Sequence, residues 1–247
     1  MNNSLLDSLF EDVITMAESE NNSLGLWREK PLGLVDFFTE MLGEKPFPGK
    51  QTELLEIVEQ ILDKDNLPEG HKLKQVTEVA AMFGKGSGKD FLVSGIVAYV
   101  PYRLNCMNDP QGYFGFGKGE PIDIINLAKN AKQAENVFFT KLKARLASCK
   151  WFKKVDRPPV AYNEYQEKKD TIIFYNNIRA FSGHSEAGSF EGFNPLVGIF
   201  DEVGDFEYEL AEFCYDTIRS SAMSRFGKRA LLLFISYPRN SLCGFSQ

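Results

Sequence analysis

The sequence predicts an α/β domain built on a doubly wound, mostly parallel β-sheet. Short apolar runs alternate along the chain with longer segments of helical periodicity, which is the pattern of repeated strand–helix units. One of these runs leads directly into a glycine-rich loop that opens a helix. Of the 247 residues 43% are hydrophobic, enough for the core of one such domain with a small appendage but not for two full domains.

The N-terminal residues 1–45 are predicted to form a helical extension. Apolar residues follow helical spacing over residues 4–18, and a second amphipathic stretch begins at Pro31. Two prolines and two glycines within residues 43–49 then break the helical pattern, so we place a boundary there. The α/β domain is assigned to residues 46–247.

The first half of this domain contains two predicted strands and three predicted helices. Residues 51–62 have an amphipathic helical pattern. Residues 76–83 are apolar and β-prone and run into the glycine-rich loop, after which residues 90–102 have a helical pattern. Residues 121–128 form the next predicted strand, and a long helix is expected over residues 131–148.

The second half repeats the alternation. Residues 171–175 form a short predicted strand, and residues 178–181 are its candidate partner. An apolar strand at 196–200 is followed by an acidic helix at 206–223, and an apolar strand at 229–236 ends the series. Strand, glycine-rich loop, helix and further strand–helix units are typical of a doubly wound sheet.

Composition limits the classes of function. The net charge of −6 and the pI near 5.2 argue against a protein that coats nucleic acid, although a local basic patch is still able to hold it. The longest apolar run, at 231–235, is far too short to cross a bilayer, and the N-terminus lacks a secretory signal. We therefore expect a cytosolic protein with no membrane contact.

The glycine-rich loop is the strongest local signal for chemistry. A chain of phosphates binds backbone N–H groups that all point inward, which requires residues without an obstructing Cβ, and a lysine at the helix start that meets the β- and γ-phosphates. Glycines meet the first requirement and Lys89 the second. The loop residues assigned to nucleotide binding are Gly84, Lys85, Gly86, Ser87, Gly88 and Lys89.

The loop departs from the usual spacing at two positions. A glycine is normally found where this chain has Phe83, and Asp90 replaces the serine or threonine that normally holds Mg²⁺. Asp90 either takes over that role with a carboxylate oxygen or leaves the metal to other residues. The alternative for the whole loop is a glycine-rich turn with a solvated lysine.

Two adjacent carboxylates, Asp201 and Glu202, end the apolar run that begins at Leu196. In open α/β sheets, ligands bind at the carboxyl ends of the strands. We therefore predict that Asp201 holds Mg²⁺ and that Glu202 orients and polarises the water that attacks the γ-phosphate. The alternative is a pair of acidic residues that merely begins a loop.

A hydroxyl group, that of Ser236, ends the last predicted strand. This position places Ser236 beside the carboxylates of the neighbouring strand, where it is predicted to sense the γ-phosphate through Glu202. Taken alone, a serine at this place is more often an ordinary strand-end residue.

Together these motifs resemble those of the large terminase subunit of tailed bacteriophages, in its N-terminal ATPase domain. That family carries an extra basic residue inside the loop, as Lys85 is here, and an adenine-contacting glutamine upstream, which Gln51 matches. Residues 126–134 resemble the strand and helix after the loop. Residues 191–195 resemble a Gly-x-Asn-Pro motif before the acidic pair, and residues 236–238 match the coupling motif.

The resemblance implies a RecA-like (ASCE) P-loop NTPase fold and a motor that hydrolyses ATP with Mg²⁺ to drive double-stranded DNA into a capsid. It implies that Gln51 reads the adenine edge, since an amide matches the N6 donor and N7 acceptor. The implied partners are double-stranded DNA, the portal protein, the small terminase subunit and further copies of the chain in a ring. The implied location is the cytoplasm of the infected host cell, at the portal vertex of the procapsid.

Two departures qualify the resemblance. Many terminases have arginine–glycine before the acidic pair, and that arginine acts across subunits, whereas this chain has Glu191 there. We therefore nominate Arg225, near the end of the helix after the acidic pair, as the arginine that acts on a neighbour's ATP. The family also carries a C-terminal nuclease domain. This chain stops at Gln247, so we expect no DNA cleavage from it.

Positive charge gathers over residues 141–157, around Trp151 and Phe152. The segment is a candidate surface for DNA or for a partner. A solvated helix end followed by a basic loop is the commoner explanation. Its members are Lys141, Lys143, Arg145, Lys150, Lys153, Lys154 and Arg157.

Two other functions remain open. A helicase-type RecA-like ATPase shares the loop, the acidic pair and the serine, but usually needs a second RecA-like domain, for which this length leaves no room. A nucleotide-gated interaction module would bind ATP with little turnover and dock through its N-terminal helices.

Overall fold

A computed structural model describes residues 25–84, 86–128, 138–184 and 192–237. The expected helix at 4–18, Lys85, Glu191 and the first part of the expected helix at 131–148 lie outside the described residues.

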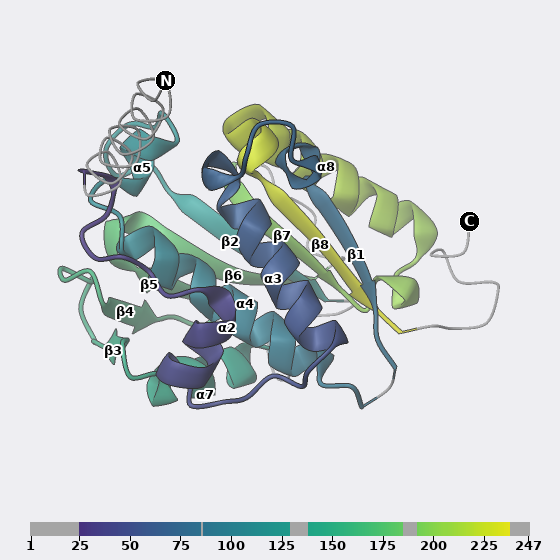
Figure 1. The fold of residues 1–247 in the computed structure, drawn as a ribbon, viewed down its shortest axis with the longest axis horizontal. Coiled ribbons are helices and arrows are strands. Elements are labelled where there is room, and N and C mark those ends of the chain that lie inside the picture. The colour runs from purple at the N-terminus through teal and green to yellow at the C-terminus, as the bar shows by residue number, and fades with distance from the viewer. Residues whose placement is uncertain (1–24, 85, 129–137, 185–191, 238–247) are drawn as a thin grey trace, which may run out of the picture.

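An eight-stranded sheet lies at the centre of the protein, with strand order β1-β8-β7-β2-β6-β5-β4-β3 (Figure 1). The five strands from β1 to β6 in this order run parallel, whereas β5 pairs antiparallel with both β6 and β4. The strands are β1 Glu78–Met82, β2 Ile122–Ala128, β3 Lys153–Lys154, β4 Glu164–Glu167, β5 Thr171–Phe174, β6 Ile178–His184, β7 Pro195–Asp201 and β8 Leu231–Ser236.

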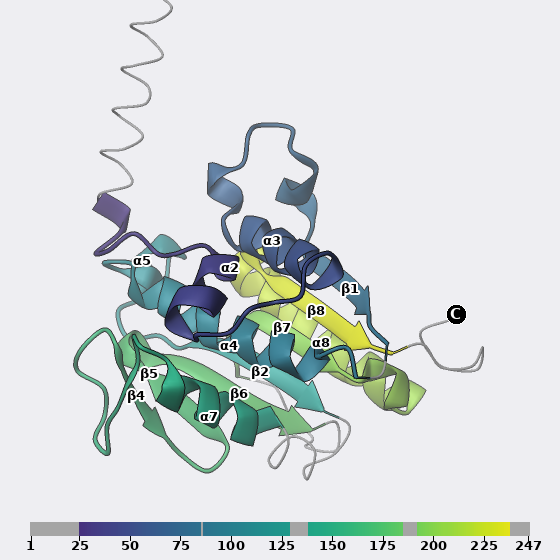
Figure 2. The same cartoon turned by 60° about the horizontal axis from the view of Figure 1, so that its bottom comes forward.

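Helices cover both faces of this sheet. Figures 1 and 2 show α3, α4 and α7 together on one face and α8 on the other. The helices are α2 Leu34–Asp36, continued by a π-helical turn at Phe37–Met41, α3 Lys50–Leu62, α4 Lys89–Asn105, α5 Pro110–Tyr113, α7 Thr140–Ser148 and α8 Tyr208–Phe226. None of the helices in the described ranges combines the length and the apolar character that a bilayer crossing requires.

The central strands β2 and β7 have the burial that their sequences predict. Every residue of β2 and β7 is buried, and both strands are nearly continuous apolar runs, as expected for parallel strands covered on both faces. The predicted doubly wound, mostly parallel sheet is therefore confirmed, and the predicted strands and the glycine-rich turn before α4 are present.

The edge strands β3 and β4 were not predicted, whereas β5 and its pairing with β6 were. Residues 149–169 have a polar sequence without an apolar run, yet β3 and β4 lie within them. In β4 only Tyr165 is fully buried, between partly exposed neighbours. A half-exposed edge strand needs little apolar sequence, which is why its pattern is weak.

Part of the expected N-terminal extension packs into the main core. Leu34, Phe37 and Phe38 are completely buried, and the Phe37 ring stacks on Tyr102 of α4 with a centroid separation of 4.8 Å. Phe38 lies directly against Gly95 of the same helix. The boundary at residue 45 stays a prediction, and the described part of the segment shares the core of the α/β domain.

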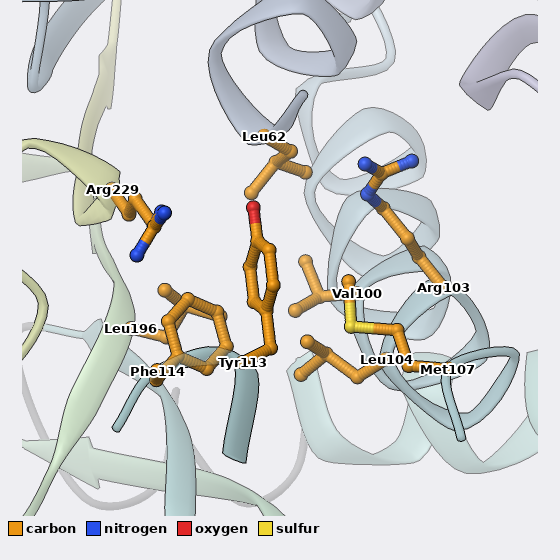
Figure 3. A pocket seen from close by; sticks show the side chains of 9 residues that line it. All are labelled: Leu62, Val100, Arg103, Leu104, Met107, Tyr113, Phe114, Leu196 and Arg229. Atoms are coloured by element: carbon orange, nitrogen blue, oxygen red, sulfur yellow. The ribbon is translucent and has the colours of Figure 1, made fainter. Parts of the chain in front are cut away.

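Polar contacts cover the end of the sheet at which the parallel strands begin. Arg229, before β8, donates to Asp65 and lies 4.7 Å from the Tyr113 ring, and the Tyr113 hydroxyl donates to the same carboxylate. The small cavity beneath them holds about 20 Å³, enough for one water molecule. Figure 3 shows its lining side chains: Leu62, Val100, Arg103, Leu104, Met107, Tyr113, Phe114, Leu196 and Arg229.

Candidate active site

The strand order brings the predicted motifs together at the opposite end of the sheet, where the parallel strands have their carboxyl ends. β8 lies between β1, which leads into the glycine-rich loop, and β7, which ends in the acidic pair. The loop, Ser236 and the two carboxylates therefore belong to three neighbouring strands.

The glycine-rich loop turns sharply from β1 into α4. Phe83 still pairs with β8, because its N–H donates to the Ser236 carbonyl at 2.9 Å, and its side chain is in the core. The turn begins only after it, which explains why this position has no glycine. Gly86 and Gly88 both have φ of +80°, a conformation that suits glycine. Gly88 caps α4, so Lys89 is its first residue.

Lys89 connects the loop to the acidic pair. Its Nζ contacts the Glu202 carboxylate and lies 3.7 Å from Asp201 Oδ1. The Lys89 side chain is only 16% exposed, so these contacts form in a partly desolvated site. Its ammonium also lies 5.3 Å from the centre of the Tyr237 ring. The structure thus brings together the three residues that the sequence assigned to phosphate, metal and water.

Glu202 has an unusual backbone. Its φ of 58° lies in the left-handed region, which is uncommon for a residue with a side chain. The conformation is fixed on both sides, since the Glu202 N–H donates to Ile235 and the Glu202 carbonyl accepts from Asp205, each at 2.8 Å. Residues held in this way cluster at functional sites. The turn directs the carboxylate toward Lys89.

Asp201 is the most buried carboxylate of the site. Its pKa is raised to about 6, chiefly by removal from water and also by the charges of Asp90 and Glu202, with Lys89 opposing them. Its Oδ1 is buried and accepts no hydrogen bond from the described residues, with Lys89 Nζ at 3.7 Å. A buried carboxylate oxygen without a donor is suited to a cation.

Ser236 lies between the loop strand and the acidic turn. It is 2% exposed, and its hydroxyl accepts from the Gly204 N–H at 3.4 Å. Its carbonyl accepts from Phe83, the last residue before the loop. Ser236 therefore contacts both the acidic turn and the last residue before the loop, and its role in sensing the γ-phosphate stays a prediction.

Asp90 forms an ion pair that the sequence did not reveal. Its carboxylate contacts the ammonium of Lys141 on α7, and a cavity of about 430 Å³ opens beside the pair between α4 and α7. Both groups also influence Asp201 electrostatically. Lys141 was assigned only to the basic segment, because its partner is 51 positions away in the chain.

Three of the six other members of the basic segment form ion pairs. Arg145 pairs with Glu44, Lys154 with Glu167 and Arg157 with Glu164. These three side chains have a structural role in the folded chain, and DNA binding by the segment stays a prediction.

Gln51 is buried beside the loop. Its Nε2 donates to the Ser87 carbonyl at 2.6 Å and its Oε1 accepts from the Phe47 N–H at 2.9 Å. Its contact with adenine stays a prediction.

Arg225 lies far from this site. α8 begins after the acidic pair and ends before β8, so its last turn lies at the edge where the strands begin. There Arg225 lies 3.8 Å from Glu120 and is half exposed. It is not brought to Lys89 of its own chain, and its action across subunits stays a prediction.

The residues present fit a nucleotide and Mg²⁺. Within the part of the chain that the structure describes, Ser87 Oγ in the loop and Asp201 Oδ1 in the acidic pair are buried without a hydrogen bond. In the described residues no three His, Cys, Asp or Glu side chains converge on a metal site. Such a site is not required, because Mg²⁺ is often bound by one or two carboxylates together with substrate phosphates.

Comparisons with known proteins agree with this geometry. A family model described as "Uncharacterized protein MJ0330, N-terminal P-loop domain" matches residues 10–245. The curated protein of that name from Methanocaldococcus jannaschii is 32% identical over 202 residues, which cover 77% of this chain and 35% of the relative. The match thus spans about a third of that relative's length.

Solved structures show the fold. The large terminase of bacteriophage HK97 has a TM-score of 0.59 and 16% identity, over 87% of this chain and 39% of that one. The large terminase ATPase domain of Thermus phage P74-26 has a TM-score of 0.50 and 17% identity, over 87% of this chain and 73% of that one. The RecA-like P-loop fold is thereby confirmed, and so is the resemblance to terminases at the level of the fold.

Proposed function

The chain belongs to the family of the N-terminal P-loop domain of protein MJ0330, and from this premise we propose that it is the ATP-hydrolysing motor domain of a DNA-packaging terminase. In this role the domain couples ATP hydrolysis to the translocation of double-stranded DNA. The similarity of its fold to phage terminase ATPase domains supports the proposal.

One observation carries it: Lys89, at the first position of α4, contacts both carboxylates at the end of β7. A lysine at a helix start that is turned toward two acidic residues is positioned to exchange them for phosphate oxygens. A solvated lysine on a glycine-rich turn would show neither the burial nor these contacts.

Each residue then has a distinct task. The loop N–H groups and Lys89 hold the phosphates of ATP. Asp201, with Asp90 as a second candidate, would hold Mg²⁺, which neutralises charge on the phosphates when bound. Glu202 orients a water molecule and accepts its proton, with the carboxylate fixed by the strained turn. Ser236 links this turn to the loop strand.

The partners follow from the terminase resemblance. Double-stranded DNA, a portal protein, a small terminase subunit and further copies of the chain are the proposed partners, at the portal vertex of a procapsid in an infected cell. The DNA-contacting residues are not assigned, since four of the seven members of the basic segment form ion pairs within the chain.

The test is steady-state ATP hydrolysis by the 247-residue chain, with and without double-stranded DNA. We expect Mg²⁺-dependent hydrolysis that DNA stimulates, and displacement of a triplex-forming strand from DNA as translocation proceeds. Lys89→Ala should lose ATP binding and leave the melting temperature unchanged. Lys50→Ala is the matched control, because this lysine is 85% exposed and its ion-pair partner among the described residues is Glu53.

Each possible failure points to a different error. Hydrolysis by Lys89→Ala at the parental rate would refute the phosphate-loop assignment. If DNA leaves the hydrolysis rate unchanged and no strand is displaced, the chain is an ATPase but not a DNA-translocating motor.

A further inference from the structure

The side-chain amide of Gln51 joins the segment before α3 to the phosphate-binding loop. Its two ends are engaged by the backbone of Phe47 and of Ser87, and the residue is only 5% exposed. The Gln51 side chain is therefore fixed in position by the segment before α3 and by the phosphate-binding loop.

The contact with Ser87 fixes one peptide of the loop. The carbonyl that Gln51 binds belongs to the peptide between Ser87 and Gly88. Because a trans peptide is planar, its carbonyl and its N–H point in opposite directions. The Gly88 N–H is therefore turned away from Gln51. Anion binding by such a loop depends on N–H groups that face the phosphates, so the orientation of this peptide affects affinity directly.

The fit around Gly88 supports the same role. A Cβ at this position would lie 3.0 Å from Gln51 Nε2, and φ is +80°. Glycine is the residue that permits both the approach and the conformation. Glycine also leaves its peptide free to rotate, so an external contact is needed to hold one orientation.

We propose that Gln51 is a positioning residue that sets the Ser87–Gly88 peptide for phosphate binding, rather than a reader of the adenine edge. The inference rests on the proposed ATPase site and specifies how that site recognises its substrate. In this role Gln51 favours binding of the polyphosphate part of the nucleotide, whichever base is attached to it.

Inorganic tripolyphosphate separates the two roles, because it carries the phosphates and has no base. Its affinity for the 247-residue chain is measured by competition with a fluorescent ATP analogue, alongside the affinities for ATP and GTP. Loss of one hydrogen bond of ordinary strength should weaken binding about tenfold. We expect Gln51→Ala to weaken tripolyphosphate, ATP and GTP binding alike, with an unchanged ATP-to-GTP ratio.

Two further variants control for folding and for the N-terminal contact. Gln51→Met keeps the approximate length and packing of the side chain but lacks both the donor to Ser87 and the acceptor for the Phe47 N–H, so it should reproduce the loss of binding in a folded chain. Thr52→Val removes the hydroxyl that donates to the Phe47 carbonyl at 3.2 Å without touching Ser87. It should bind tripolyphosphate like the parent.

The outcomes distinguish the two proposals. Parental affinity for tripolyphosphate in Gln51→Met, together with a reduced preference for ATP over GTP, would overturn the positioning role and establish adenine recognition. An equal loss in Thr52→Val would also overturn it, because the effect would then come from the N-terminal segment. A parent chain that binds neither ATP nor tripolyphosphate would refute the proposed function itself.

Discussion

Lys89 Nζ lies 3.7 Å from Asp201 Oδ1 and in direct contact with Glu202, so one ammonium of the loop binds both carboxylates at the end of β7. The ammonium thus partly neutralises both carboxylates. Under the proposed function, a phosphate that binds Lys89 competes with these carboxylates, so we expect Glu202 to become available to a water molecule when ATP binds.

Glu202→Gln should bind ATP at least as tightly as the parent and lose turnover. The amide competes less for Lys89, yet it cannot accept a proton from water, and the loss of such a group lowers rates by about 10²- to 10⁴-fold. Nucleotide affinity and single-turnover hydrolysis measure the two effects. Turnover of Glu202→Gln at the parental rate would show that Glu202 is not the base that accepts the proton from water.

Asp201→Asn should act on the metal dependence instead. The variant replaces the buried carboxylate with a neutral amide, which is a weaker ligand for Mg²⁺. We expect the Mg²⁺ concentration needed for half-maximal ATP binding to rise, while ATP affinity without Mg²⁺ changes little. Equal losses with and without the metal would contradict the division of roles between Asp201 and Glu202.

Lys141→Ala should weaken ATP binding by roughly fivefold, the equivalent of one exposed ion pair. The reason is that Asp90, left without its partner, places an uncompensated negative charge beside the phosphates. The double variant Lys141→Ala with Asp90→Asn should regain most of the affinity, because the charge is removed with its partner. Lys143→Ala, on the same helix, is the control. A double variant as weak as Lys141→Ala would contradict this charge effect. It would show either that Asp90 holds Mg²⁺ or that Lys141 itself contacts the nucleotide.

The sequence was sufficient for features that depend on local pattern and insufficient for those that depend on packing. β2 and β7 are buried along their whole length, so their apolar runs predicted them, and the glycines before Lys89 predicted the turn. The contact of Asp90 with Lys141 has no local signal, because it arises only when α7 packs against α4. The partner of Gln51 is likewise a backbone carbonyl, which no side-chain pattern encodes.

Gly95→Ala should destabilise the fold by about 1–3 kcal/mol, although alanine favours a helix more than glycine does. A Cβ on Gly95 would lie 1.9 Å from Cζ of the buried Phe38 ring, so the ring or α4 must move. Thermal unfolding measures the effect. Adding Phe38→Leu should recover part of the loss, since the shorter side chain leaves room for the methyl group. Unchanged stability in Gly95→Ala would show that the segment before α3 is not tightly packed on α4.

Arg225 should matter only between subunits. It lies at the edge where the strands begin, beside Glu120, whereas Lys89 and Glu202 lie at the opposite edge. Any action on ATP must therefore be on a neighbouring chain, where an arginine stabilises charge on the transferring phosphoryl group. Specific ATPase activity should then rise with protein concentration, and Arg225→Ala should remain slow at all concentrations. Arg219→Ala, which removes an exposed arginine of α8 paired with Glu78, is the matched control.

Mixing two inactive variants gives the decisive measurement for Arg225. In a mixture of Arg225→Ala and Glu202→Gln chains, an interface forms in which the first supplies an intact Glu202 and the second an intact Arg225. That interface should hydrolyse ATP, so the mixture should exceed the sum of its parts. Neither variant alone offers such an interface. Activity per molecule that is independent of concentration, with Arg225→Ala at the parental rate, would exclude this arginine and direct the search to another surface of the domain.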